Sequence, residues 1–143
     1  MRISDVLKTK QHPAVVTITP EAGVRQLVAT LAEHNIGALI VSSDGTTMIG
    51  IVSERDVVRR MHSDGTVIDN TVGGIMTEVV KTCSADDDLD DVLRTMTEGR
   101  FRHIPVVDGD ALVGIVSIGD LVKNKIDRLE FERDQLDSYV HQL

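Results

Sequence analysis

Aromatic residues are scarce in this chain of 143 residues, which has one tyrosine, two phenylalanines and no tryptophan. Its core must therefore be aliphatic, and it offers no row of aromatic rings on which nucleic-acid bases stack. Basic residues are also in the minority, since 15 lysines and arginines face 23 aspartates and glutamates and leave a formal net charge of −8. Because neutralisation of nucleic-acid phosphates normally needs a basic patch, both deficits argue against a nucleic-acid partner.

Cysteines and long apolar runs are lacking as well. Cys83 is the single cysteine, so no internal disulfide can form, and a reducing cytoplasm is the expected location. The longest uninterrupted aliphatic run, at residues 38–41, is far shorter than the roughly 20 residues that span a bilayer. The first residues form no apolar signal core. We therefore expect a cytoplasmic protein with no membrane contact.

One short phrase occurs twice in the chain. Residues 50–56 read Gly-Ile-Val-Ser-Glu-Arg-Asp, and residues 114–120 read Gly-Ile-Val-Ser-Ile-Gly-Asp. A repeated fold unit needs only its apolar positions to recur, whereas this repeat also keeps a glycine, a serine and an aspartate. The repetition indicates two related binding sites.

The sequence around the phrase repeats too. Apolar residues at helical spacing follow Thr19 in the first copy and Ser84 in the second, and we expect these two residues to cap helices. Asp-Gly turn signals at 44–45 and 108–109 separate two strand-like runs in each copy. Each unit reads β-α-β-β-α. Since a unit of about 60 residues buries little surface alone, we expect an α/β (α+β) fold of two units related by a pseudo-two-fold axis.

The repeat also sets the expected domain boundaries. The first unit covers residues 1–62, a linker with little periodicity covers 63–74, the second unit covers 75–126, and a C-terminal helical extension covers 127–143. Positions at alternate spacings of four and three residues run through the end of the chain: Val122, Ile126, Leu129, Arg133, Leu136, Val140 and Leu143. This heptad seam predicts a long helix whose stripe either contacts a second subunit, which we favour, or folds back onto its own domain.

The repeated serines and aspartates have two interpretations. Ser53 and Ser117 end expected strands, and Asp56 and Asp120 lie in the first turn of the helices that follow. A carboxylate at this place can accept hydrogen bonds from the two vicinal hydroxyls of a ribose. Ser-x-x-Asp also resembles a capping box, whose side chains only satisfy backbone N–H groups. The phrase alone leaves both interpretations open.

Further polar residues lie near the same strand ends. Thr17 and Thr82 share a position before the first helix of each unit and offer hydroxyl groups at the rim of a cleft. Arg102 and His103 precede a strand-like run and supply charge for a phosphate, and Arg55 adds a cation inside the first copy of the phrase. Surface solvation and ordinary strand capping are the alternatives.

The sequence shows no arrangement typical of catalysis. Its five histidines are scattered without metal-ligand spacing, Cys83 has no evident base, and the repeated serines lack a nucleophile elbow. The aspartates within 86–91 suit a helix start better than a metal site, because neighbouring side chains on a helix diverge. We therefore expect a protein that is not an enzyme and holds no metal.

The order of these motifs resembles the CBS domain. The shared features are Thr-x-Thr/Ser, an amphipathic helix, His-Ile-Pro-Val-Val-Asp and Gly-Ile-Val-Ser-x-x-Asp, and their double occurrence over about residues 3–126 resembles a tandem CBS pair, or Bateman module. The resemblance implies a regulatory module that binds AMP, ADP, ATP, NADH or S-adenosylmethionine in clefts between the units and signals by conformational change. It also implies a disc-shaped homodimer with an unidentified effector protein. The alternative is a scaffold dimer with empty clefts.

The resemblance also assigns roles to residues. The repeated aspartates match the residue that holds ribose hydroxyls, the repeated serines match one that reaches ribose or phosphate, and Arg102 with His103 matches a phosphate-contacting pair. The expected adenine rim is Thr17, Thr19, Gly37, Ala38, Thr82, Ser84, His103 and Ile104. The remaining expected ligand-binding residues are Arg55, Pro105 and Gly119. Gly119 holds the position in the second copy of the phrase that Arg55 holds in the first. Because the first unit lacks this proline and the Arg-His pair, we expect the two clefts to hold phosphate differently.

Overall fold

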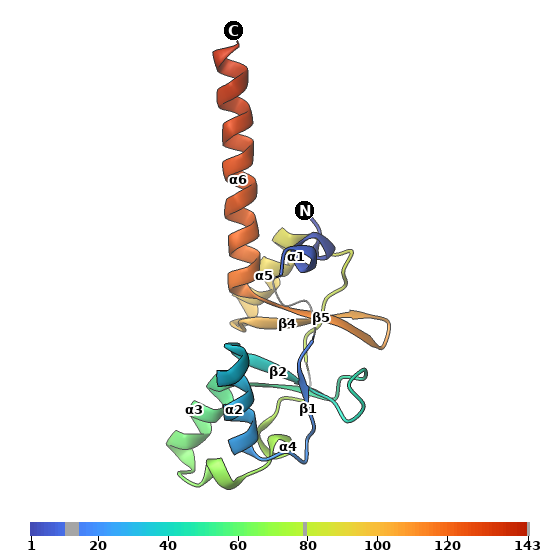
Figure 1. Ribbon diagram of the computed structural model, residues 1–143, viewed down its shortest axis with the longest axis vertical. Coiled ribbons are helices and arrows are strands. Elements are labelled where there is room, and N and C mark those ends of the chain that lie inside the picture. The colour runs from blue at the N-terminus through green and yellow to red at the C-terminus, as the bar shows by residue number, and fades with distance from the viewer. Residues whose placement is uncertain (11–14, 79, 143) are drawn as a thin grey trace.

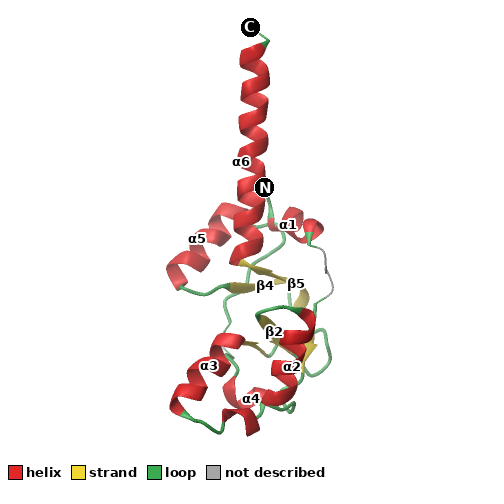
Figure 2. Ribbon diagram, turned by 60° about the vertical axis from the view of Figure 1, so that its left-hand side comes forward, coloured by secondary structure: helices red, strands yellow, loops and turns green. Residues whose placement is uncertain are grey.

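Two α/β units lie one above the other, and one long helix projects from the upper unit (Figure 1). The computed structural model describes residues 1–10, 15–78 and 80–142. In both units the strands lie toward the middle of the molecule, where the units meet, and the helices lie on the outer sides (Figure 2). The predicted α/β fold of two repeated units with a long C-terminal helix is confirmed.

The lower unit in Figure 1 comes from the first half of the chain. Its elements are β1 (Thr17–Ile18), α2 (Val24–His34), β2 (Ala38–Val41), β3 (Gly50–Ser53) and α3 (Glu54–Ser63). Its sheet has the order β1-β2-β3, with β1 parallel to β2 and β2 antiparallel to β3. Every residue of β2 is buried, and Leu27 and Leu31 of α2 belong to the same apolar core. This core is aliphatic, as the scarcity of aromatic residues predicts.

The upper unit comes from the second half. Its elements are α5 (Leu89–Gly99), β4 (His103–Asp108), β5 (Ala111–Ser117) and α6 (Ile118–His141), with β4 antiparallel to β5. The counterpart of β1 is reduced to one residue, Cys83, which forms a single parallel bridge with β4. Its N–H donates to the carbonyl of Pro105 at 3.0 Å, and its carbonyl accepts from the N–H of Val107 at 2.9 Å. The second unit therefore keeps the predicted order with a shortened first strand.

The expected helix caps at Thr19 and Ser84 are wrong. A turn follows each of these residues, closed by a hydrogen bond from Ala22 N–H to the Thr19 carbonyl at 3.2 Å and one from Asp87 N–H to the Ser84 carbonyl at 3.1 Å. The helices begin four residues later than expected, after Gly23 and Asp88. The turns place both expected caps before the helices, where they cannot reach the first helical N–H groups.

Each short helix that precedes one unit packs against the other unit. We call α1 (Ile3–Thr9) and α4 (Val72–Ile75) the lead-in helices. Ile3 and Val6 of α1 are buried in the core of the second unit, whereas Val72 and Ile75 of α4 are buried in the core of the first. The expected linker also contains a short 3-10 helix, η1 (Val67–Asp69), whose Val67 joins the first core. The exchange ties the two units together.

The repeated glycines make this exchange possible. A Cβ atom added to Gly50 would lie 2.8 Å from the carbonyl oxygen of Thr77 and 3.0 Å from the sulfur of Met76. A Cβ atom added to Gly114 would lie 2.8 Å from a methyl carbon of Leu7. In both copies a lead-in segment packs against the strand at the glycine, where a side chain would clash. This contact explains why the phrase has a glycine in both copies.

The C-terminal helix α6 leaves the second unit after its first two turns. Leu121 and Asn124 are buried among its described residues, and the rest of the helix projects away from both units (Figure 1). Leu129 is 51% exposed and Leu136 is 66% exposed. The described part of the heptad stripe therefore does not fold back onto its own domain. Leu143 lies outside the described residues.

Candidate ligand-binding clefts

Two clefts open where the units meet. The larger has a volume of about 900 Å³ and is called the Asp120 cleft, because Asp120 and Ser117 lie in its wall. The smaller has a volume of about 340 Å³ and is called the Asp56 cleft, after the matching pair Asp56 and Ser53. Both copies of the repeated phrase therefore face a cavity, as expected for two related sites.

Matching chain turns bring cleft residues into place in both units. Asn35 ends α2 with a φ of 52°, and Arg100 ends α5 with a φ of 58°, so both helices stop in the left-handed conformation. The chain then enters the central strand of its unit. This turn places Asn35 and Gly37 in the wall of the Asp120 cleft, and Arg100 and Arg102 in that of the Asp56 cleft.

The repeated Ser-x-x-Asp forms a capping box in both units. Asp56 Oδ2 accepts from Ser53 N–H at 2.8 Å, and Asp120 Oδ2 accepts from Ser117 N–H at 2.9 Å. Each serine hydroxyl accepts in return from the aspartate N–H, at 3.3 and 3.1 Å. The boxes use only Oδ2, and the Oδ1 atoms of both aspartates accept no hydrogen bond from the described residues. Capping and ligand binding are therefore compatible, since one carboxylate can do both.

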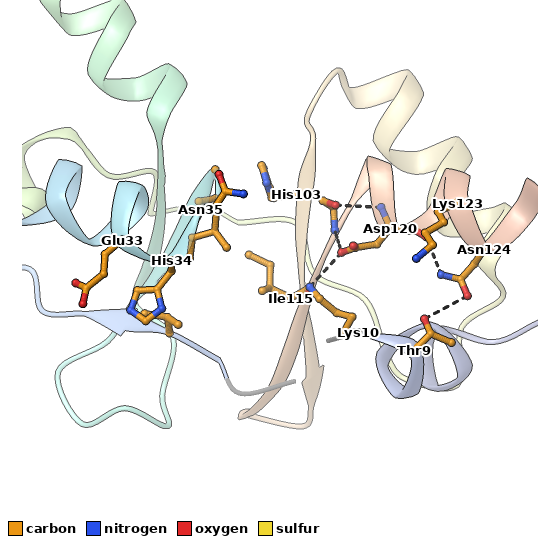
Figure 3. Close-up of a pocket in the computed structure, with 15 residues that line it drawn as sticks. Thr9, Lys10, Glu33, His34, Asn35, His103, Ile115, Asp120, Lys123 and Asn124 are labelled. Atoms are coloured by element: carbon orange, nitrogen blue, oxygen red, sulfur yellow. Dashed lines mark hydrogen bonds and ion pairs between the residues drawn. The ribbon is translucent and has the colours of Figure 1, made fainter. Parts of the chain in front are cut away.

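Asp120 has a cationic partner that the sequence did not reveal. Lys10, at the end of α1, places its ammonium group 3.1 Å from Asp120 Oδ2 and donates to the carbonyl of Ile115 at 2.7 Å (Figure 3). Burial favours the neutral carboxyl, but hydrogen bonds from Ser117 and the charge of Lys10 outweigh burial and lower the pKa of Asp120. The carboxylate is therefore ionised at neutral pH.

His103 lines both clefts, and Figure 3 shows it among the residues of the Asp120 cleft. A Cβ atom added to Gly37 would lie 3.2 Å from the imidazole Cε1, so the glycine lets the ring approach the first unit closely. Burial of the ring lowers the pKa of His103; Asp120 and Glu54 oppose this shift, and Lys10 and Arg102 support it. His103 is therefore neutral at pH 7 and can both donate and accept a hydrogen bond.

We expect His103 to make stability depend on pH. Because its pKa is lower in the folded state, the unfolded chain binds more protons in the window just below pH 6.5, and the free energy of unfolding falls as the pH drops through that window. Urea unfolding at pH 7.5 and 5.5 measures this loss, which should be smaller in His103→Asn. His62→Asn, at an exposed histidine outside both clefts, is the control. An equal loss in His103→Asn and wild type would contradict the assignment.

The Asp56 cleft gathers positive charge from both units. Its wall contains five basic side chains: Arg55, Arg59, Lys81, Arg100 and Arg102. None of the five forms an ion pair with another described residue. In a chain with a formal net charge of −8, this unpaired cluster is a strong local exception. Such a wall can hold an anionic group of a ligand through charge-assisted hydrogen bonds.

Nine of the predicted site residues line one or both clefts. Gly37, Ala38 and His103 line both clefts; Ser117 and Asp120 line the larger; and Ser53, Arg55, Asp56 and Arg102 line the smaller. The remaining predicted residues line neither cleft: Thr17, Thr19, Thr82, Ser84, Ile104, Pro105 and Gly119. Ile104 and Pro105 are buried in β4, and Thr17 lies in β1, where it pairs with Ile40.

Several cleft residues were not predicted. Lys10, Lys123 and Asn124 line the Asp120 cleft, and Arg59 and Lys81 line the Asp56 cleft. Helical spacing offered a signal for two of them, because Arg59 follows Arg55 by one turn and Lys123 follows Asp120 by nearly one turn. No sequence signal marks Lys10 or Lys81.

The family model for the CBS domain matches residues 3–63 and 72–127. The chain belongs to the CBS-domain family. It is 35% identical over 146 residues to the CBS domain-containing protein CBSX3, mitochondrial, of Arabidopsis thaliana, covering 96% of this chain and 71% of that protein. The crystal structure of the CBS-domain protein ATU1752 from Agrobacterium tumefaciens matches with a TM-score of 0.82 at 36% identity, covering 87% of this chain and 99% of that chain.

A second solved CBS protein is CBSX2, whose crystal structure is described as a complex with AMP. It matches with a TM-score of 0.75 at 25% identity, covering 88% of this chain and 96% of that chain. The double match confirms the tandem CBS pair inferred from the repeated phrase. Among the described residues of this CBS pair, no helix combines the length and apolarity needed to cross a bilayer, and no three potential metal-ligating side chains lie together.

Proposed function

We propose that this CBS pair is a non-catalytic sensor that binds an adenosine-containing ligand between its units and responds by conformational change. The observation that carries the proposal is the pair of capping boxes, each of which faces a cleft with one carboxylate oxygen free of hydrogen bonds from described residues. A ribose offers two adjacent hydroxyl donors that suit such a carboxylate. The AMP complex of CBSX2 supports the same ligand class.

The charge of the Asp56 cleft favours a phosphorylated ligand there. Five unpaired cations surround it, so AMP, ADP or ATP gains charge-assisted hydrogen bonds. S-adenosylmethionine carries a sulfonium cation, which the same cluster repels. The Asp120 cleft has a more balanced wall, with two lysines and two carboxylates, whereas the five cations of the Asp56 cleft share its wall with only Glu54 and Asp56. The proposal is therefore one ribose-binding carboxylate in each cleft and a stronger hold on phosphate in the Asp56 cleft.

The response passes through α6 in this proposal. Asp120 lies in the first turn of α6, so a ligand held by Asp120 contacts the helix that carries the exposed heptad stripe. A second copy of the chain is the partner that this stripe suits, because a repeating apolar seam pairs with its own kind in coiled coils. An effector protein would then read the change in the homodimer, in the cytoplasm as expected from the sequence.

Isothermal titration calorimetry tests the ligand class. We expect AMP or ATP to bind wild type, and Asp56→Asn or Asp120→Asn to weaken binding in its own cleft by roughly 10- to 100-fold, the cost of about one charge-assisted hydrogen bond. Asparagine keeps the size of the side chain and an oxygen that can accept the capping hydrogen bond, and circular dichroism checks the helices. Light scattering on the same samples reports whether the chain is a homodimer.

The titration also distinguishes the alternative. If AMP, ATP, NADH and S-adenosylmethionine all release no heat at millimolar concentration, the clefts are empty and the scaffold interpretation holds. If a ligand binds but neither aspartate substitution weakens it, the ribose assignment is wrong.

A further inference from the structure

The two ribose-binding carboxylates of the proposed function differ in one contact. Asp120 Oδ2 accepts from Ser117 N–H and also lies 3.1 Å from the ammonium group of Lys10. Asp56 Oδ2 accepts from the N–H and the hydroxyl of Ser53, at 2.8 and 3.1 Å, and forms no ion pair with a described residue. A hydroxyl proton rotates to another acceptor at little cost, whereas a cation must leave the carboxylate.

Lys10 is held in this place from two sides. Its ammonium group donates to the carbonyl of Ile115 at 2.7 Å, in addition to the ion pair with Asp120. The side chains of Lys10 and Asp120 are 22% and 29% exposed, so solvent screens this pair less than the exposed ion pairs elsewhere on the surface. The backbone of Lys10 caps α1 through a hydrogen bond to the Leu7 carbonyl. The pair thus links the first lead-in helix to the start of α6.

We propose that Lys10 competes with the ligand for Asp120. A ribose has to displace the ammonium group of Lys10 from the carboxylate before it can bind in the Asp120 cleft. The inference rests on the proposed function, because it concerns the same ribose site. Oδ1 can accept one ribose hydroxyl, and the second hydroxyl needs the lone pair of Oδ2 that the Ser117 N–H leaves open, which Lys10 occupies. The Asp56 cleft has no such competitor among the described residues and fills first.

Displacement of Lys10 also gives the ligand a mechanical effect. When the ammonium group leaves Asp120, it keeps only one of its two anchors, the hydrogen bond to the Ile115 carbonyl. The end of α1 then loses its ion pair to the first turn of α6, while Leu7 still packs against Gly114 of β5 and Thr9 still hydrogen-bonds Asn124 of α6. Occupancy of the Asp120 cleft thereby changes how the lead-in helix is held against the second unit.

Adenosine is the probe for this competition, because it carries the ribose diol and no phosphate that could attract a lysine. Calorimetry in the Asp56→Asn background isolates the Asp120 cleft. We expect Lys10→Met to raise the affinity for adenosine about three- to fivefold, the upper end of what an ion pair near the surface contributes. Lys8→Met is the matched control, because Lys8 is an exposed lysine of the same helix α1 and lines neither cleft. It should leave the affinity within about twofold.

The outcomes separate this proposal from the function on which it rests. Adenosine binding that Lys10→Met leaves unchanged or weakens would overturn the role of Lys10 and leave the proposed function intact. An equal gain in Lys8→Met would also overturn it, since general charge removal would then be the cause. If adenosine and ATP bind neither wild type nor any variant, the proposed function fails and this inference fails with it.

Discussion

Arg55→Glu combined with Arg102→Glu is expected to lower the affinity of the Asp56 cleft for ATP by a hundredfold or more. The two guanidinium groups line this cleft from opposite units and form no ion pair with described residues, so they are free to bind phosphate. Each charge-assisted hydrogen bond contributes about 1.5–3 kcal/mol, and the loss of two accounts for the expected change. Calorimetry with ATP in the Asp120→Asn background measures it.

Adenosine and salt supply the controls for this double substitution. Adenosine lacks phosphate, so its affinity for the same cleft should change by less than about threefold. Raising the salt concentration should weaken ATP binding in wild type and much less in the double variant, because salt screens the lost attraction. Lys8→Glu adds the same kind of charge change on an exposed residue outside both clefts. Equal losses for adenosine and ATP would show that the substitutions damage the fold rather than the phosphate site.

Gly50→Ala is expected to destabilise the protein by about 2–3 kcal/mol, a typical cost of overpacking. The added Cβ would lie 2.8 Å from the carbonyl oxygen of Thr77, a backbone atom that cannot move alone because Thr77 and Ile51 exchange two backbone hydrogen bonds. For a chain of this size the melting temperature should fall by roughly 10 °C. Differential scanning calorimetry without ligand measures the change.

Two other glycines of the repeated phrase make matched controls. Gly114→Ala meets a methyl carbon of Leu7 at 2.8 Å, and the end of a flexible side chain moves more easily than a backbone, so its loss should be smaller. Gly119→Ala has no neighbour nearer than 3.7 Å and replaces a helical glycine, so it should leave the stability unchanged or raise it by up to about 1 kcal/mol. A Gly50→Ala variant as stable as Gly119→Ala would contradict the packing of the lead-in segment.

The sequence predicted those features that recur at fixed spacing. Leu27 and Leu31 recur at helical spacing, and β2 is a short apolar run, so the elements of the core could be recognised locally. The phrase that contains Ser53 and Asp56 occurs twice with its polar residues intact, which identified the first turn of α3 and of α6 as the place of the clefts. Both predictions use only neighbouring residues in the chain.

The remaining features depend on contacts that are distant in sequence. Lys10 and Ile115 are 105 positions apart, and they meet only because α1 crosses to the second unit. Arg102 follows α5 of the second unit and yet lines the cleft of Asp56 in the first. Thr19 carries the sequence signal of a helix cap, but its carbonyl closes a turn, and α2 begins only after that turn, at Val24. Tertiary packing decides these positions, and local patterns do not report it.

The binding of ATP to wild type and to the Asp56→Asn/Asp120→Asn double variant tests the central claim most directly. Calorimetry under identical conditions gives the number of sites per chain and their affinities. We expect wild type to bind ATP with unequal affinity in two sites per chain, tighter in the Asp56 cleft, and the double variant to bind ATP roughly 10- to 100-fold more weakly in each cleft. ATP binding of equal strength to wild type and double variant would contradict the two ribose-binding carboxylates.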